Sequence, residues 1–238
     1  MKKIMFNDEY GLTKAVLERR KTQTRRIITP KPTYKDNCGI CWKGYAYGLN
    51  PFDFNEPFGS YMNFVTGTEY DKSCRRYRRG EVIAVAQSYK DAGFRPDKIL
   101  YRSIPRIDGY KQETAASQKG WSNKMFVAAN LMPHQIRITD VRVERLQDIS
   151  DDDCLKEGVV VNEPKIKGGI NMYYPCEYLR SCAKEVGWGR VFHTPREAFA
   201  ELINNVSRKD VWQENPYVFV YDFELVDLDL TVIFPLGT

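Results

Sequence analysis

The segment 217–225 has apolar side chains on both faces of a strand, and this limits the fold more than any other part of the sequence. One face carries five large apolar side chains: Tyr217, Phe219, Tyr221, Phe223 and Leu225. Val218 and Val220 occupy the other face. Because a strand that is apolar on both faces must be covered on both, we expect the first half of this segment to be a central strand of a barrel.

Four further runs have the composition of strands, namely residues 81–87, 99–104, 135–146 and 230–234. In the third run, Ile136 and Ile138 share one phase of the alternation, while Val141 and Val143 have the opposite phase. One extra residue near Thr139 would account for this change, since side chains along a strand repeat with a period of two. The pattern therefore predicts a β-bulge there.

Short helices are expected in three places. Residues 12–19 have the apolar spacing of a helix with one buried face. Ser150 with Asp153, and Thr194-Pro195-Arg196-Glu197, are helix starts with capping residues. Gly158 is placed to end the second helix. We predict one α+β domain over residues 1–238, a small mixed β-barrel with flanking helices and loop-rich insertions at about 30–73 and 159–193.

Two basic runs lie in the first third of the chain, at residues 19–26 and 75–79. The net charge is only +5, so the position of the cations matters more than their number. One reading is a solvated helix end whose cations complement the helix dipole. The other is a surface that binds something anionic, in which a helical turn or tight bend brings Lys21 and Thr24 side by side. Both readings stay open on the sequence.

The remaining composition excludes several classes of protein. No apolar run reaches the roughly 20 residues that cross a bilayer, so we expect a cytoplasmic protein with no membrane contact. With two histidines in the chain, a multi-histidine metal site is excluded. Cys38 and Cys41 have zinc-knuckle spacing without a matching second pair, so we expect free thiols, no bound metal and no cofactor.

A lysine, a threonine and a carboxylate remain as possible catalytic groups. A lysine that is partly desolvated among other cations loses proton affinity and can act as a base near neutral pH. In that role Lys21 would activate the hydroxyl of Thr24 as a nucleophile, and Glu157 would orient the lysine or pass a proton to a leaving amine. We expect Lys21 and Glu157 to lie within about 4–6 Å of each other, or to be bridged by Thr24.

Four motifs in order resemble those of ASCH-domain proteins. They are the early helix running into residues 20–26, the strand start at 80–82, residues 140–149 leading into Glu157-Gly158, and residues 212–223. The similarity is greatest to the phage- and prophage-associated branch. It implies a PUA-like β-barrel that recognises RNA or a modified nucleoside. Small amidohydrolases of the family, which deacetylate N4-acetylcytidine, use a Lys, a Thr and a Glu, and these fall on Lys21, Thr24 and Glu157.

The first functional hypothesis is a PUA-like barrel that binds RNA or a modified nucleobase in a cleft floored by Lys21, Thr24 and Glu157. The expected nucleic-acid-binding residues are Arg20, Arg25, Arg26, Arg75, Arg76, Tyr77, Arg78, Arg79 and Trp121. Arginines would hold phosphate, and Tyr77 or Trp121 would stack on a base. The alternatives are an amidohydrolase acting on free acylated nucleosides and a phage accessory protein that binds another protein through its aromatic insertion. The sequence does not set the oligomeric state.

Overall fold

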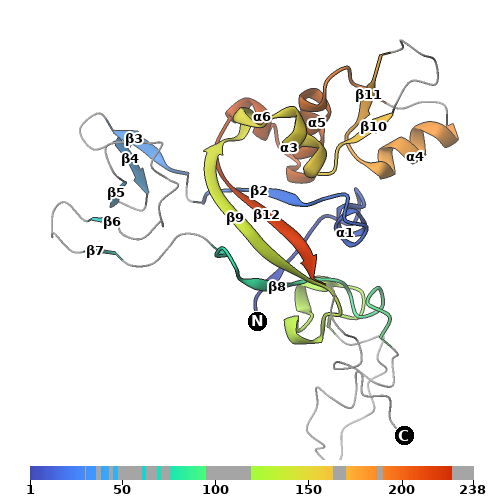
Figure 1. The fold of residues 1–238 in the computed structure, drawn as a ribbon, viewed down its shortest axis with the longest axis horizontal. Coiled ribbons are helices and arrows are strands. Elements are labelled where there is room, and N and C mark those ends of the chain that lie inside the picture. Colours follow the sequence, from blue (N-terminus) through green and yellow to red (C-terminus); the bar gives the residue numbers. More distant parts are fainter. Residues whose placement is uncertain are drawn as a thin grey trace, which may run out of the picture.

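The computed structural model describes residues 1–29, 31–35, 39–42, 45–47, 61–62, 69–70, 76–94, 119–162, 170–186 and 190–226 (Figure 1). Within these ranges the fold is mixed α+β, with a core made mostly of sheet and a few short helices. The predicted fold class is thus confirmed at this level. The described residues form no closed barrel.

The main sheet has five strands in the order β1-β8-β9-β12-β2. Their bounds are Lys3–Ile4 (β1), Val82–Val85 (β8), Gln135–Arg145 (β9), Tyr217–Val226 (β12) and Gln23–Ile27 (β2). β1 is parallel to β8, and the other neighbouring pairs are antiparallel. Figure 1 shows β9 and β12 as long, strongly bent strands that run side by side through the middle of the sheet.

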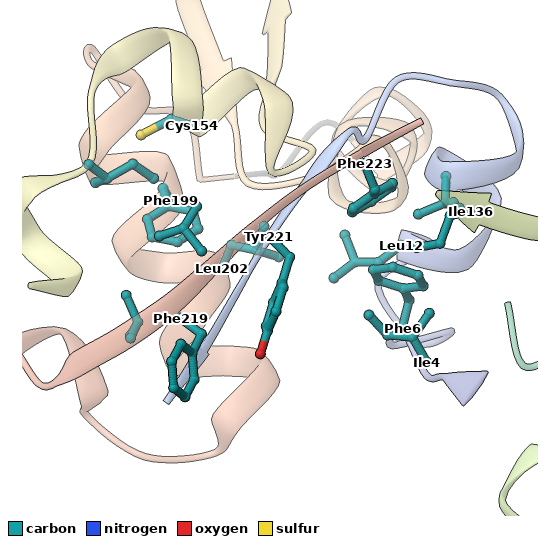
Figure 2. Packing of buried hydrophobic residues seen from close by; sticks show 14 of the residues in the cluster. Ile4, Phe6, Leu12, Ile136, Cys154, Phe199, Leu202, Phe219, Tyr221 and Phe223 are labelled. Atoms are coloured by element: carbon teal, nitrogen blue, oxygen red, sulfur yellow. The ribbon is translucent and has the colours of Figure 1, made fainter. Parts of the chain in front are cut away.

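The predicted central strand is confirmed. β12 pairs with β9 on one side and β2 on the other, and the four residues from Val218 to Tyr221 are each buried. Burial of one such side chain stabilises a fold by about 1.5–3 kcal/mol. Figure 2 shows Phe219 and Tyr221 on one side of β12, with Phe199 and Cys154 on the other.

The predicted β-bulge is also present in β9. Asp222 pairs with Asp140, while the next residue of β12, Phe223, pairs with Ile138. Thr139 is therefore the extra residue, and the side chains of β9 change face at this point. The phase change between the isoleucines and valines of this strand is a direct consequence.

The described residues include the α-helices α1 Leu12–Leu17, α3 Asp151–Lys156, α4 Glu177–Val186, α5 Pro195–Ser207 and α6 Val211–Glu214. Three 3-10 helices span Lys124–Phe126, Ala129–Leu131 and Leu146–Asp148. The predicted caps are present: the side chain of Ser150 accepts from the Asp153 N–H, and Thr194 and Glu197 form a complete capping box. The sequence reading did not foresee α4 or α6.

The first insertion contains a second sheet of short strands in the order β3-β4-β5-β6-β7. These strands span Thr33–Lys35, Gly39–Trp42, Tyr45–Tyr47, Tyr61–Met62 and Glu69–Tyr70. Figure 1 shows this small sheet to one side of the main sheet.

In the second insertion, β10 (Val160–Asn162) pairs with β11 (Met172–Tyr174), and Tyr173 forms a bridge with Phe192. The strands expected at 99–104 and 230–234 lie outside the described residues.

The reading of the first basic run as a helical turn is wrong. The helix ends at Leu17, and Arg19, with a φ of 60°, reverses the direction of the chain. Residues 23–27 then form β2, an extended strand fixed on β12 by hydrogen bonds from Phe223 N to Thr22 O (2.8 Å) and from Ile28 N to Tyr217 O (3.1 Å). Successive side chains of the run therefore point to opposite faces of the sheet.

β1 and β2 are the two edges of the main sheet, and the described residues show no backbone pairing between them. One side chain connects them: Arg26 of β2 donates from Nη2 to the main-chain oxygen of Met5, which directly follows β1 (2.6 Å). A side-chain bond thus joins the edges where a closed barrel would have a backbone ladder.

Gly158 packs closely against the residues that precede β2, and its backbone has a φ of 109°. A Cβ at this position would lie 3.4 Å from Leu12 Cδ2 and 3.8 Å from Lys21 Cδ. We expect Gly158→Ala to lower the free energy of unfolding by about 1–2 kcal/mol, because an L-residue is strained at this φ. Urea denaturation would measure the change.

The matched control is Gly80→Ala, at a φ of 80°, where a Cβ would meet nothing within 4 Å. Both substitutions introduce backbone strain at a positive φ. If Gly158→Ala is no more destabilising than this control, the neighbours of Gly158 add nothing to that strain.

Candidate functional site

The two faces of β2 have different environments. Arg25 pairs in register with Val220, whereas Thr24 and Arg26 pair with Tyr221 and Phe219. Because directly opposed residues of an antiparallel pair share a face, Gln23 and Arg25 face one way and Thr24 and Arg26 the other. The first face is covered by α3 and α5, and the second lies over the aromatic residues of the core.

Lys21, just before β2, forms a buried ion pair with Glu157 at the end of α3. Its Nζ lies 2.5 Å from Glu157 Oε2 and donates a second hydrogen bond to the main-chain oxygen of the same residue (2.6 Å). The lysine and glutamate side chains are only 2% and 6% exposed. The expected proximity of these two residues is confirmed.

The pKa of Lys21 is lowered. Burial is the main cause, since removing the ammonium group from water disfavours its charged form, and the positive charges of Arg26 and Arg25 act in the same direction. The carboxylate of Glu157 opposes this shift. The direction of this pKa shift is the one expected of a lysine base, while a catalytic role stays a prediction.

Arg25 extends this pair into a buried network. Its guanidinium contacts Glu157 Oε1 (3.2 Å), Glu144 Oε1 (2.5 Å) and Asp153 Oδ2 (3.1 Å). It also donates to the side-chain oxygen of Gln23.

A second arginine, Arg142, joins the network through Asp153 (2.6 Å) and Asp222. With its donors occupied and its side chain 1% exposed, Arg25 does not form part of a binding rim as expected from the sequence.

Thr24 lies on the face opposite to Arg25 and is 4% exposed. Within the described part of the chain, its hydroxyl has no hydrogen-bond partner. The structure therefore leaves this hydroxyl available, but records no contact that joins it to Lys21 or Glu157.

A cavity of about 420 Å³ lies between the edges β1 and β2. Its lining combines the two edges, the aromatic face of β12 and the start of the second basic run: Ile4, Met5, Arg26, Ile27, Ile28, Thr29, Arg76, Tyr77, Phe219 and Tyr221. Arg26 and Arg76 are both exposed. A hollow with aromatic walls and two cations is thus formed by segments far apart in the sequence.

Tyr77 forms a wall of this cavity and is 3% exposed. Its hydroxyl donates to the main-chain oxygen of Lys3 (2.9 Å), and its ring lies edge-on to Tyr221 at 5.3 Å between centroids. A ring held in this way is part of the core, so it does not present the open stacking face that the sequence suggested.

The other expected binding residues are dispersed. Arg20 pairs with Glu18 at 2.5 Å. Arg78 and Arg79 are exposed but do not line the cavity. Trp121 packs against a separate cluster that contains Met132, and Arg75 lies outside the described residues.

The described residues contain no group of three or more His, Cys, Asp or Glu side chains that would hold a metal ion. Burial raises the pKa of the Cys154 thiol to about 12, so this cysteine is a core residue rather than a nucleophile. Cys38 lies outside the described residues.

None of the described helices is long and apolar enough to cross a membrane.

Several residues of the site had no signal in the sequence. Met5 contributes only its main-chain oxygen, and Phe6 places its ring 5.9 Å from Lys21 Nζ and 5.7 Å from Arg26 Cζ. Glu144 was read as an ordinary strand residue. A buried arginine needs a carboxylate partner. Had Arg25 been predicted to be buried, a search for its partner could have pointed to Glu144.

Comparisons of this chain with family models, with curated proteins and with solved structures find no match. The resemblance to a family accordingly rests on the four motifs alone.

The buried pair of Lys21 and Glu157 predicts a large stability effect. We expect Lys21→Met to lower the free energy of unfolding by about 3–5 kcal/mol, because it leaves a buried carboxylate without one of its partners. The double variant Lys21→Met/Glu157→Gln should lose less than the sum of the two single changes. Urea denaturation of all four proteins would measure the coupling.

Lys2→Met is the matched control, since Lys2 forms an exposed pair with Glu81 at 2.9 Å. Its loss should cost about 0–1 kcal/mol. If Lys2→Met and Lys21→Met lower the free energy of unfolding by the same amount, the buried pair does not contribute to stability as proposed.

Proposed function

We propose that this chain binds RNA or a modified nucleobase in the cavity between β1 and β2, as an ASCH-domain protein of the phage- and prophage-associated branch with a PUA-like barrel. The observation that carries the proposal is the cavity itself, whose lining combines the exposed Arg26 and Arg76 with the aromatic residues Tyr77, Phe219 and Tyr221.

The size and lining of the cavity support this ligand class. Its volume of about 420 Å³ lies in the usual range of small-ligand pockets. The apolar lining, which includes the exposed side chain of Ile27, suits contact with a heterocycle, and guanidinium groups suit the phosphates and base edges of RNA. Both kinds of contact are available within one hollow.

Thr29 provides a test, because it lines the cavity and is exposed. We expect Thr29→Trp to weaken the binding of a short single-stranded RNA containing N4-acetylcytidine by about tenfold or more, since the indole would occupy the hollow. Fluorescence anisotropy of labelled RNA, with and without the acetyl group, would measure the affinity.

Thr29→Ser serves as the control and should bind as the wild type does. Equal affinity in Thr29→Trp and the wild type would rule out this cavity as the RNA site.

Amidohydrolysis of an acylated nucleoside is a second candidate, and the buried Lys21 with its lowered pKa favours it. A neutral amine has two N–H groups and one lone pair. In the structure Nζ donates to two oxygens of Glu157, and the lone pair would remain for the proton of the Thr24 hydroxyl.

The reaction would proceed through an acyl-enzyme. Thr24 Oγ1 passes its proton to Lys21 and attacks the acyl carbonyl carbon, the carbon–nitrogen bond breaks, and the amine leaves with a proton delivered through Glu157. Water then hydrolyses the ester on Thr24. This sequence requires Thr24 Oγ1 to come within about 2.6–3.2 Å of Lys21 Nζ in the substrate complex.

Hydrolysis of free N4-acetylcytidine tests this candidate. We expect Thr24→Val, which keeps the shape but removes the hydroxyl, to lower the rate by about 10²-fold or more, and Thr24→Ser to keep activity. Lys21→Arg should also lose activity, because arginine keeps the charge but cannot act as a base. The wild-type rate should rise with pH as Lys21 loses its proton.

A wild-type protein without turnover, or a Thr24→Val variant as active as the wild type, would exclude the acyl-enzyme route. The protein-binding alternative depends on the aromatic residues of the insertion at 30–73, and the side chains of residues 33–73 lie outside the described part of the structure.

A further inference from the structure

Arginines of this protein fall into two groups. Seven of those described form ion pairs with carboxylates: Arg20, Arg25, Arg137, Arg142, Arg180, Arg190 and Arg208. Arg26 and Arg76, like Arg78, Arg79, Arg145 and Arg196, form no ion pair in the described part of the chain, and of these Arg26 and Arg76 line the cavity between β1 and β2. Two uncompensated cations therefore share one hollow.

These two guanidinium groups act on each other. Part of the Arg26 side chain is exposed, yet the surrounding protein desolvates its guanidinium and lowers its pKa, and the positive charge of Arg76 acts in the same direction. Arginine keeps its proton even so. An anion placed between the two would relieve their repulsion.

The nearby carboxylates are engaged elsewhere. Glu157 is bound by Lys21 and Arg25. Glu81 pairs with Lys2 and accepts from the main-chain N–H of Arg78. Glu157 still acts favourably on Arg26, but neither carboxylate forms an ion pair with the two arginines, so within the described part of the chain the two guanidinium groups are left to pair with a ligand.

Arg26 is held in place before any ligand arrives. Its Nη2 donates to the Met5 oxygen (2.6 Å), and its Cζ lies 5.7 Å from the ring centroid of Phe6. Arg76 lies over the ring of Tyr77 at 5.6 Å. A guanidinium has five N–H donors, so donors remain for an anion, and fixed donors bind one at a lower entropic cost.

We infer that Arg26 and Arg76 hold a phosphate group, so that the ligand of this cavity is a phosphorylated nucleotide, either a residue of RNA or a nucleoside monophosphate, rather than a free nucleoside. This inference rests on the proposed function, and it specifies the substrate class. Phosphate suits the pair because its oxygens accept hydrogen bonds from two guanidinium groups at once. The base then lies against the apolar wall.

The test is calorimetric titration of the full chain with four probes: N4-acetylcytidine, its 5′-monophosphate, inorganic phosphate, and a short single-stranded RNA containing the modified base. We expect both phosphorylated nucleic-acid probes to bind about tenfold more tightly than the nucleoside, or better. Arg26→Gln and Arg76→Gln should abolish this preference.

Arg79→Gln is the matched control, since Arg79 belongs to the same basic run but does not line the cavity. It should keep the preference. If the monophosphate binds more tightly than the nucleoside and the RNA does not, the mononucleotide is the source of the phosphate. If the RNA binds more tightly than the nucleoside and the monophosphate does not, RNA is the source.

Other outcomes separate the inference from the proposed function. Equal binding of nucleoside and nucleotides, unaffected by the two arginine variants, would overturn the phosphate site and leave base recognition standing. Inorganic phosphate that binds as tightly as the monophosphate, and depends on both arginines, would support the phosphate site and overturn base recognition. No binding of any probe would overturn both.

Discussion

The position of β2 depends on a buried set of charges that joins it to α3. Lys21 and Arg25 share the carboxylate of Glu157, one on each oxygen, and Arg25 also reaches Asp153 on the same helix. A buried charge is costly unless it is paired, so these contacts leave the strand and the helix few alternative arrangements. The placement of Lys21, and of the cavity on the other face of β2, follows from this anchoring.

The alternation of β2 then separates two kinds of arginine. Arg25 faces the helices, where its charge is neutralised. The next residue, Arg26, faces the aromatic side, where its contacts with described residues are to a main-chain oxygen and a ring. Neighbouring residues of the same type therefore have opposite properties. A substitution of Arg25 would change the stability of the fold, whereas a substitution of Arg26 would change the lining of the cavity.

The features that could be predicted from the sequence were those determined by residues close together along the chain. The apolar residues on both faces of β12, the phase change at Thr139 and the capping residues Ser150 and Thr194 all signal their structure within a few positions. β2 gave no such signal, because its buried residues are polar or charged. Their burial is possible because carboxylates more than a hundred positions away in the sequence pair with them. The closeness of Lys21 and Glu157 was expected, and Arg26 and Arg76 were both expected in one binding surface, but nothing local in the sequence placed them in a cavity between β1 and β2.

The bond from Arg26 to Met5 has a mechanical consequence. Two strands joined by a ladder of backbone hydrogen bonds separate only when several of these bonds break together. At the seam between the edges β1 and β2, a charged hydrogen bond worth about 1.5–3 kcal/mol takes the place of such a ladder in the described residues. The seam can thus widen without disturbing any strand pairing in the sheet. An anion that uses the donors of Arg26 left over by the Met5 oxygen would keep this bond in place, so that one guanidinium would hold both the ligand and the two edges of the sheet.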